Sequence, residues 1–292
     1  MTSTPRIGLI GPGIMGRPMG INLMNAGYSL SVYARRESSA AELLAAGASF
    51  YNTPAKLAKN SDIIISIVAD TPDVEAVLLG ENGVIEGAAE GLLVIDMSTI
   101  SPVTTTEITE KLALKGIRML DAPVSGGEAG AIAGTMTIMV GGEQVDFDEA
   151  YPVLAAMGKT ITLIGGHGAG QIVKACNNMI IAQTIIAVSE SFEMAKKAGV
   201  DLSKAREALS GGFAGSKVME IHAKRMIDDD YTPGFKAKLH NKDLRIAAST
   251  IETYGLNLPS SQLAINYMQQ LVDMGHGEID SAALAKVVNK EA

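Results

Sequence analysis

One lysine followed by two amides is the most suggestive group of polar side chains in this sequence. Lys174 stands in a largely apolar stretch, and Asn177 and Asn178 follow three and four residues later. Residues at these spacings share a helix face, so a helix would place both amides beside the ammonium group. Burial and a nearby helix N-terminus both disfavour a charged ammonium group, which suits a proton donor. A lysine that extends from a helix end into solvent is the alternative.

The element that would position Lys174 runs from Gly168 to Gly199. It has no proline and no glycine after Gly170, and residues 175–189 carry no charge. As one helix it would span about 40–45 Å, so we expect it to connect two domains. A helix that is apolar on most faces is buried on most faces. Asn177, Asn178, Gln183 and Thr184 interrupt the apolar run, so we do not expect a membrane span.

A second pattern, near the N-terminus, indicates phosphate binding. An expected buried strand at residues 6–10 leads into a glycine-rich turn that opens a helix. The first glycine of G-x-G-x-x-G permits a tight turn, the second lets the backbone approach a pyrophosphate, and the third allows close packing of helix on strand. The helix N-terminus offers free N–H groups. We predict that a dinucleotide binds here, through Gly11, Pro12, Gly13, Ile14, Met15 and Gly16.

The end of the next expected strand bears on the choice of cofactor. Many NAD-binding folds place a carboxylate there to hold the ribose hydroxyls. Here Ala34 is followed by Arg35 and Arg36, and the first carboxylate is Glu37. Two guanidinium groups suit a 2′-phosphate, so NADP(H) is favoured and NAD(H) stays possible. A solvated turn is the alternative.

Further apolar runs at residues 62–69 and 92–99 lead into helical stretches. Such runs are typical of a parallel sheet covered on both faces, whose ligands bind at the carboxyl ends of the strands. We therefore expect cofactor contacts from Val68, Ala69, Asp70 and Thr99, although Asp, Ser and Thr also favour turns.

Two more motifs carry candidate residues. Residues 118–123 lead into Ser125, Gly126 and Gly127, whose successive N–H groups could form a nest for a substrate carboxylate. A flexible hairpin loop before the strand at residues 136–140 is the alternative. Lys242 precedes Asp243 early in a later helix; it could reach the cofactor or form a surface ion pair.

Length and composition limit the function classes. The chain has 292 residues, 47% of them apolar, and a net charge of −8, which disfavours binding to nucleic acid or to an anionic membrane. One cysteine, Cys176, and four histidines without paired spacing predict no metal site. The short polar N-terminus predicts a cytoplasmic protein. We predict a dinucleotide-binding α/β domain with a doubly wound, Rossmann-like sheet at residues 1–165 and an all-α domain at residues 166–292 for substrate and oligomerisation.

Taken together, the motifs resemble the β-hydroxyacid dehydrogenase family, which includes 3-hydroxyisobutyrate dehydrogenases and tartronate semialdehyde reductases. The resemblance covers nearly the whole chain, and the sequence at residues 211–216 with that at residues 239–243 looks most like the tartronate semialdehyde reductase branch. The motifs are GLIGPGIMG at residues 8–16, DAPVSGG at 121–127, GxGxxxK at 168–174 and KDL at 242–244. Pro12 stands where leucine is commoner, and Asp280-Ser281-Ala282 stands where that branch often has Asp-His-Ser, which puts substrate details in doubt.

The resemblance implies a role for each motif. Lys174 matches the catalytic lysine, Asn177 and Asn178 match the asparagine positions after it, and Lys242 matches a lysine that contacts the cofactor. Ser125, Gly126 and Gly127 match the substrate-binding loop, and Thr99 matches a cofactor-loop residue. The implied reaction is NAD(P)H-dependent reduction of 2-hydroxy-3-oxopropanoate to D-glycerate, with Lys174 as general acid. Separately, the apolar faces of the long helix lead us to expect a homodimer or homotetramer, because one small domain would not cover all of them.

Alternatives stay open at this point. The substrate could instead be 3-hydroxyisobutyrate, succinic semialdehyde or glyoxylate. Imine reductases share the architecture but usually lack a lysine at this position, so Lys174 counts against them. A nucleotide-sensing module without turnover is a reading from a different class, and relatives of that kind tend to lose the lysine.

Overall fold

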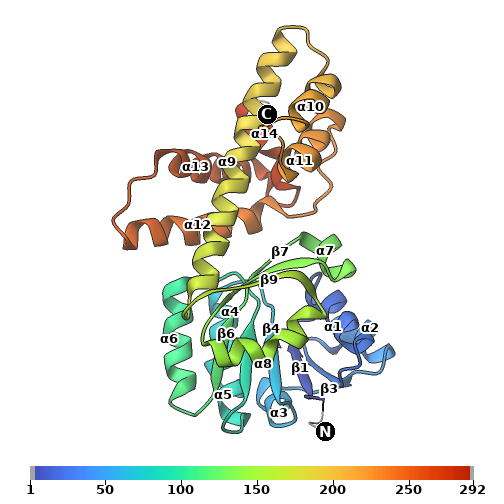
Figure 1. Cartoon of the computed structure of the whole chain (residues 1–292), viewed down its shortest axis with the longest axis vertical. Coiled ribbons are helices and arrows are strands. Elements are labelled where there is room, and N and C mark those ends of the chain that lie inside the picture. The colour runs from blue at the N-terminus through green and yellow to red at the C-terminus, as the bar shows by residue number, and fades with distance from the viewer. Residues whose placement is uncertain (1–3, 290–292) are drawn as a thin grey trace. The chain divides into compact units, whose positions relative to one another are not determined.

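The computed structural model describes residues 4–289, which form two compact units. Unit 1 ends at Lys174 and unit 2 begins at Ala175, so the division falls inside helix α9 (Ala169–Lys197). Figure 1 shows unit 1 as a sheet flanked by helices and unit 2 as helices. The predicted order, a Rossmann-like α/β part followed by an all-α part, is confirmed. The predicted domain boundary at residues 165/166 lies just before α9 and stays a prediction.

Within the described residues, unit 1 holds a nine-stranded sheet in the order β3-β2-β1-β4-β5-β6-β8-β7, with β9 paired to β8. The strands from β3 to β6 in that order are parallel, and β8 runs antiparallel to β6. The order reverses between β2-β1 and β4-β5, and ligands of such sheets bind beside that reversal at the carboxyl ends. The strands are β1 (Ile7–Ile10), β2 (Leu30–Tyr33), β3 (Ser49–Phe50), β4 (Ile63–Ser66), β5 (Leu93–Asp96), β6 (Arg118–Asp121), β7 (Val124–Ser125), β8 (Met136–Gly141) and β9 (Gly158–Gly165).

Both faces of the sheet are covered, which explains why its central strands are continuously apolar. Leu9 and Ile65 belong to one hydrophobic cluster, while Ile10 and Ile64 belong to another, because successive side chains point to opposite faces. Helices α1 (Gly16–Asn25) and α8 (Gln144–Ala155) contribute to the first cluster, and α3 (Pro54–Lys59), α4 (Thr71–Leu79) and α6 (Pro102–Ala113) to the second.

Several short elements of unit 1 have no counterpart in the sequence prediction. They are η1 (Glu37–Ala40), α2 (Ala41–Ala45), α5 (Val84–Gly87) and α7 (Gly127–Ala133). Each is too short to show the periodicity on which a sequence prediction depends. The hairpin that was the alternative for this segment is present, because β7 pairs antiparallel with β8, but the connection between these strands contains helix α7.

The described part of unit 2 has helices and one isolated bridge, between Lys236 and Asp280. Asp201 and Ser216 accept hydrogen bonds from the N–H groups that begin α10 and α11, as helix-capping residues do. Helix α13 ends at Leu271, and a π-helical turn (Val272–His276) follows it. The helices after α9 are α10 (Leu202–Ser210), α11 (Lys217–Asp228), α12 (Ala237–Thr253), α13 (Pro259–Leu271) and α14 (Leu284–Val288), with η3 (Ser281–Ala283) before the last.

Helix α9 supplies much of the core of unit 2. Ala182, Ile185 and Phe192 of this helix pack with residues of α11 to α14 in one hydrophobic cluster. By length and composition alone α9 could cross a membrane, and 44% of its most apolar window is buried inside the structure. Its apolar character is thus used in protein packing.

Candidate active site

The glycine-rich turn after β1 has the local geometry that the sequence predicts. Gly11 has φ +92°, and a Cβ there would lie 2.2 Å from the carbonyl oxygen of Ile67, so only glycine fits. A Cβ on Gly16 would lie 2.1 Å from the Gly11 oxygen. A Cβ on Gly13 would have nothing within 4 Å. The turn is therefore tight at its ends and open in the middle, where a phosphate needs access to the backbone.

Helix α1 begins at the end of this turn, and two of its first N–H groups, those of Arg17 and Met19, donate to the carbonyl oxygens of Gly13 and Met15. It has no acidic residue in its first turn and no side chain that caps it. The first N–H groups of a helix lack intrahelical partners and carry partial positive charge. Gly11 to Gly16 therefore fit a pyrophosphate, whose negative charge would complement the positive end of the helix dipole.

Ala34, Arg35 and Arg36 follow β2, the strand next to β1. The Arg35 side chain is 84% exposed and makes a long ion pair, 3.7 Å, with Asp73 of α4. Arg36 is exposed and precedes η1. Neither guanidinium group is buried, so both could contact a phosphate group at the carboxyl end of β2.

In the loop after β4, Asp70 begins a helix, which is the alternative that the sequence left open to cofactor binding. Asp70 caps α4, and its Oδ1 accepts a hydrogen bond of 2.7 Å from the Thr71 N–H. Val68 donates its N–H to Ser98 Oγ, 2.9 Å away, so this loop is tied to the loop after β5. Ala69 lies between Val68 and Asp70 in the chain. Thr99 follows Ser98 in the second of these loops, as predicted.

Asp96, the last residue of β5, organises these two loops. Its Oδ1 accepts hydrogen bonds from Ser66 Oγ and Ser98 Oγ, while no hydrogen-bond partner reaches its Oδ2. The side chain is fully buried, and burial raises its pKa to about 6 against the lowering effect of the serine hydrogen bonds. Asp121 of β6, its neighbour in the sheet, adds a like charge.

The predicted substrate loop is partly β-strand and partly helix. Ser125 is half-buried in β7, paired with Thr137 of β8. Gly126 and Gly127 begin α7 with φ +141° and +60°, a geometry that side chains disfavour. These glycines give the loop the unusual backbone that a nest of N–H groups requires.

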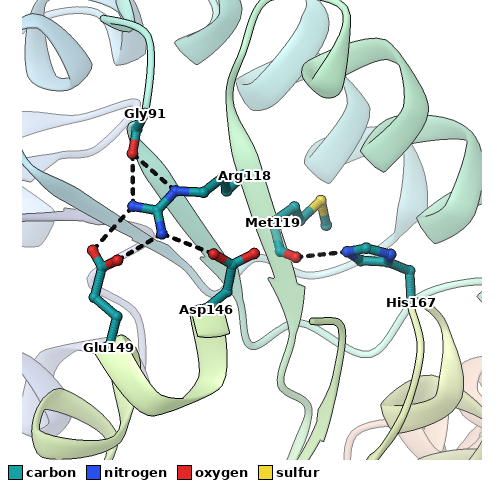
Figure 2. Close-up of polar contacts among 6 residues, drawn as sticks. All are labelled: Gly91, Arg118, Met119, Asp146, Glu149 and His167. Atoms are coloured by element: carbon teal, nitrogen blue, oxygen red, sulfur yellow. Dashed lines mark hydrogen bonds and ion pairs between the residues drawn. The ribbon is translucent and has the colours of Figure 1, made fainter. Parts of the chain in front are cut away.

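The start of α9 is held against β6 by side chains on both segments. Asp121 accepts hydrogen bonds from the N–H groups of Gly168 at 2.8 Å and Gln171 at 3.0 Å. Figure 2 shows the His167 ring directed at the carbonyl oxygen of Met119, 3.1 Å from Nε2. A Cβ on Gly170 would lie 2.4 Å from the Met139 oxygen, so the helix can approach this closely only at a glycine.

The opposite end of β6 is anchored by Arg118. Its guanidinium group contacts Asp146 and Glu149 of α8 and donates to the carbonyl oxygen of Gly91 (Figure 2). The hydrogen bond to Glu149 is the main cause that raises the Arg118 pKa above its ordinary value. Both ends of β6 are thereby fixed, and the start of α9 is hydrogen-bonded to Asp121 at one of them.

Lys174 lies in the second turn of α9 and is 7% exposed. The helix predicted for this segment is present, so Asn178 lies one turn further along the face of Lys174. Asn178 is 2% exposed; its Nδ2 donates to Asp243 Oδ2 at 2.6 Å, and its Oδ1 accepts from Asn177 Nδ2 at 2.9 Å. The two amides are thus bonded to each other.

Lys242 is paired with Asp243, with 2.8 Å between Nζ and Oδ1. The ion pair that was the alternative is therefore present, but it is not a surface pair, because the Asp243 side chain is only 4% exposed. Asp243 therefore joins Lys242 to Asn178 in unit 2, and His240 of the same helix contacts the Asn178 carbonyl oxygen at 3.0 Å. Sequence reasoning gave no role to Asp243 or His240.

Sequence reasoning also missed Asp121 and Gln171 as individual residues. Asp121 was noted only as the first residue of a motif, and its position at the end of a buried strand is the signal that could have identified it. Gln171 is 1% exposed, and a polar side chain in the first turn of an apolar helix is a weak signal by itself. Among residues 4–289 no group of three His, Cys, Asp or Glu side chains could hold a metal ion.

Known proteins match the chain over nearly its full length. Residues 6–165 match the family described as the NAD-binding domain of 6-phosphogluconate dehydrogenase. Residues 168–288 match the family described as NAD-binding of NADP-dependent 3-hydroxyisobutyrate dehydrogenase.

Individual relatives agree with these matches. The chain is 44% identical to 2-hydroxy-3-oxopropionate reductase of Escherichia coli, over 97% of each chain. It is 34% identical to NAD-dependent L-serine dehydrogenase of Pseudomonas aeruginosa, again over 97% of each chain. A solved structure of Mycobacterium tuberculosis 3-hydroxyisobutyrate dehydrogenase superposes with a TM-score of 0.91 at 29% identity, covering 99% of this chain and 100% of that one.

The glycine turn at the switch point of a doubly wound sheet and the matching families define an NAD(P)-dependent oxidoreductase. The chain belongs to the β-hydroxyacid dehydrogenase family, whose members include the 3-hydroxyisobutyrate dehydrogenases. The family resemblance and the enzyme class predicted from the sequence are confirmed.

Proposed function

We propose that the enzyme reduces tartronate semialdehyde, 2-hydroxy-3-oxopropanoate, to D-glycerate with NADPH. The observation that carries the proposal is the buried Lys174, held in the second turn of a helix whose start is fixed to the dinucleotide-binding sheet. The 44% identity to the 2-hydroxy-3-oxopropionate reductase of E. coli supports the choice of substrate. Because one relative is an L-serine dehydrogenase, other hydroxyacids are alternative substrates.

Residues of unit 1 would hold the cofactor. Gly11, Pro12, Gly13, Ile14, Met15 and Gly16 would bind the pyrophosphate, and Ala34, Arg35 and Arg36 the adenosine ribose with its 2′-phosphate. When bound, the dihydronicotinamide supplies a hydride. Val68, Ala69, Asp70 and Thr99 at the neighbouring strand ends, and Lys242 of unit 2, are the further proposed cofactor contacts.

The chain's own residues would bind and protonate the substrate. The N–H groups at Ser125, Gly126 and Gly127 would hold the substrate carboxylate. As the aldehyde carbon is reduced, negative charge develops on its oxygen, and the Lys174 ammonium would stabilise that charge and transfer a proton to the oxygen. Asn178, with Asn177, would orient the lysine or the substrate hydroxyl.

The proposal extends to the enzyme's location and assembly. We propose a cytoplasmic enzyme that assembles as a homodimer or homotetramer. Exposed apolar side chains on α9, Ile180 and Met194, are available for such packing. We expect no nucleic-acid partner, because the chain is acidic overall.

Other activities stay as alternatives. They are oxidation of 3-hydroxyisobutyrate and reduction of glyoxylate or succinic semialdehyde. Imine reductases share the fold at 18–21% identity, which supports the fold alone, and Lys174 argues against that chemistry. A nucleotide-sensing module without turnover is disfavoured by the same lysine.

The test combines a substrate panel with a lysine variant. We expect NADPH oxidation to be fastest with tartronate semialdehyde. Lys174→Ala should lower kcat by about 10²–10⁴-fold, the usual contribution of general acid catalysis, with little change in cofactor Kd. Lys196→Ala is the control, because it removes an exposed positive charge from the same helix. Near-normal kcat in Lys174→Ala would contradict the proposal.

A further inference from the structure

Gln171 joins the first turn of α9 to the loop that follows β5. Its Nε2 donates to the carbonyl oxygen of Ser98 at 2.8 Å, and its Oε1 accepts from the N–H of Ile100 at 3.1 Å. These two backbone groups flank Thr99. Because a carbonyl only accepts and an N–H only donates, the orientation of the amide is fixed by its partners.

The side chain is in the interior, where such bonds matter most. Gln171 is 1% exposed, so loss of either bond would leave a buried backbone group without its partner. A side chain that bonds both the Ser98 carbonyl oxygen and the Ile100 N–H must carry one donor and one acceptor on the same planar group. Among natural residues of this length, glutamine does so at every pH.

The connection continues beyond Thr99. Ser98, whose oxygen accepts from Gln171, also holds the Val68 N–H through its hydroxyl and is itself fixed by Asp96. One amide therefore ties the loops after β4 and β5 to α9. Gln171 lies three residues before Lys174, on the same helix face.

We infer that Gln171 is a positioning residue, which holds the cofactor loop at Thr99 in register with the turn of α9 that presents Lys174. The inference rests on the proposed function, because it assigns Thr99 to the cofactor and Lys174 to the substrate oxygen. Hydride donor and proton donor would then be aligned through one side chain. Misplacement of reacting groups by about 1 Å can cost about 10²-fold in rate.

The test uses two substitutions with opposite expectations at low pH. Gln171→Met keeps the volume and removes both bonds, and the backbone N–H of residue 171 still reaches Asp121. We expect kcat to fall by about 10–100-fold and the primary isotope effect with C4-dideuterated NADPH to rise, because hydride transfer becomes limiting. Substrate KM should change far less than kcat.

Gln171→Glu distinguishes positioning from simple loss of packing. An ionised carboxylate repels the Ser98 oxygen, whereas a protonated carboxyl can donate to that oxygen and accept from the Ile100 N–H. We therefore expect kcat of Gln171→Glu, relative to the wild type, to recover as the pH falls, while that of Gln171→Met does not. A role in stability alone would lower the fraction of folded enzyme but leave the isotope effect of the folded enzyme unchanged in both variants.

Gln183→Met is the matched control. Gln183 lies further along α9, is half-buried and donates to Ser261. Normal kcat and an unchanged isotope effect in Gln171→Met, as in this control, would overturn the inference. Lys174→Ala, measured in parallel, separates the two failures: if it loses activity while Gln171→Met does not, only the positioning role is wrong. If it keeps full activity, the proposed function fails, and the positioning role with it.

Discussion

Arg35 and Arg36 decide the proposed preference for NADPH. Both are exposed at the end of β2, and the 3.7 Å contact of Arg35 with Asp73 is too long and too exposed to hold it firmly. A guanidinium group that is not engaged elsewhere can form a bidentate, charge-assisted pair with a phosphate. No carboxylate at this strand end competes for the ribose hydroxyls before Glu37.

The prediction is that Arg35→Ala and Arg36→Ala weaken NADPH much more than NADH. We expect KM for NADPH to rise about 10-fold or more in each variant, since hydrogen bonds to charged groups contribute about 1.5–3 kcal/mol. Initial rates with both cofactors measure this. Lys115→Ala, which removes an exposed charge just past the end of α6, is the control. Equal losses for the two cofactors would contradict the phosphate assignment.

Other residues show why side-chain roles are harder to predict than motifs. Asp70 was predicted to contact cofactor, yet its carboxylate is engaged at the start of α4. Lys242 was paired with Asp243 in sequence, but only the structure shows that Asp243 bonds Asn178 in another helix. Such links join residues that are far apart in the chain, so spacing along the sequence does not reveal them.

At the scale of elements, the start of α9 determines where Lys174 lies. Asp121 accepts hydrogen bonds from two N–H groups there, and its negative charge complements the positive end of the helix dipole. Burial raises the Asp121 pKa, and the two backbone hydrogen bonds oppose that rise. The helix approaches β6 and β8 so closely that Gly170 has no room for a side chain.

We predict that Gly170→Ala displaces the start of α9. The added Cβ would meet the Met139 oxygen at 2.4 Å and Asp121 Oδ2 at 2.8 Å, so backbone must move. Overpacking of this kind costs about 1–3 kcal/mol, and we expect a lower Tm together with a lower kcat. Gly166→Ala is the control, because its Cβ would have nothing within 4 Å. Thermal melts and kinetics of both variants measure this; wild-type behaviour of Gly170→Ala would show that the helix start tolerates the shift.

Much of the element structure could be predicted from the sequence. The long apolar runs form buried parallel strands, because a strand that is covered on both faces is apolar throughout. The amphipathic stretches after residue 200 form helices, because a helix that is buried on one face repeats its apolar residues with the helical period. The antiparallel direction of β8 and the helix α7 left no such pattern. The direction of β8 depends on pairing with a distant segment, which local sequence does not encode, and α7 is too short to show a period.

At the scale of the whole molecule, two buried aspartates give the units opposite responses to acid. Burial raises the Asp96 pKa in unit 1 to about 6. Burial would also raise the pKa of Asp280 in unit 2, but the His222 ring, 3.4 Å away, and hydrogen bonds from the N–H groups of Ala282 and Phe235 lower it to about 2.

The sign of each effect follows from proton linkage. Folded Asp96 keeps a proton that the unfolded chain loses above about pH 4, so its contribution to the free energy of unfolding falls as the pH rises from about 4 to about 6. Asp280 contributes stability above about pH 4, which is lost as the pH falls toward about 2.

We predict that Asp96→Asn removes the first dependence and Asp280→Asn the second. Each group changes the slope by at most about 1.4 kcal/mol per pH unit, the value for one proton. Urea unfolding of the wild type and both variants from about pH 2.5 to about pH 7, which covers the Asp96 window and most of the Asp280 window, measures these slopes. A wild-type slope in either variant, in its own window, would show that the group does not titrate as its surroundings indicate.

The single cysteine gives the protein a natural attachment point for a probe. Cys176 is exposed on α9, and its position two residues after Lys174 turns its sulfur away from the lysine's side of the helix. A thiol-reactive dye would therefore label the unaltered chain once, near the reacting groups but not on them. Its emission could follow ligand arrival in real time, and energy transfer between dyes on different copies would count the subunits of an assembly.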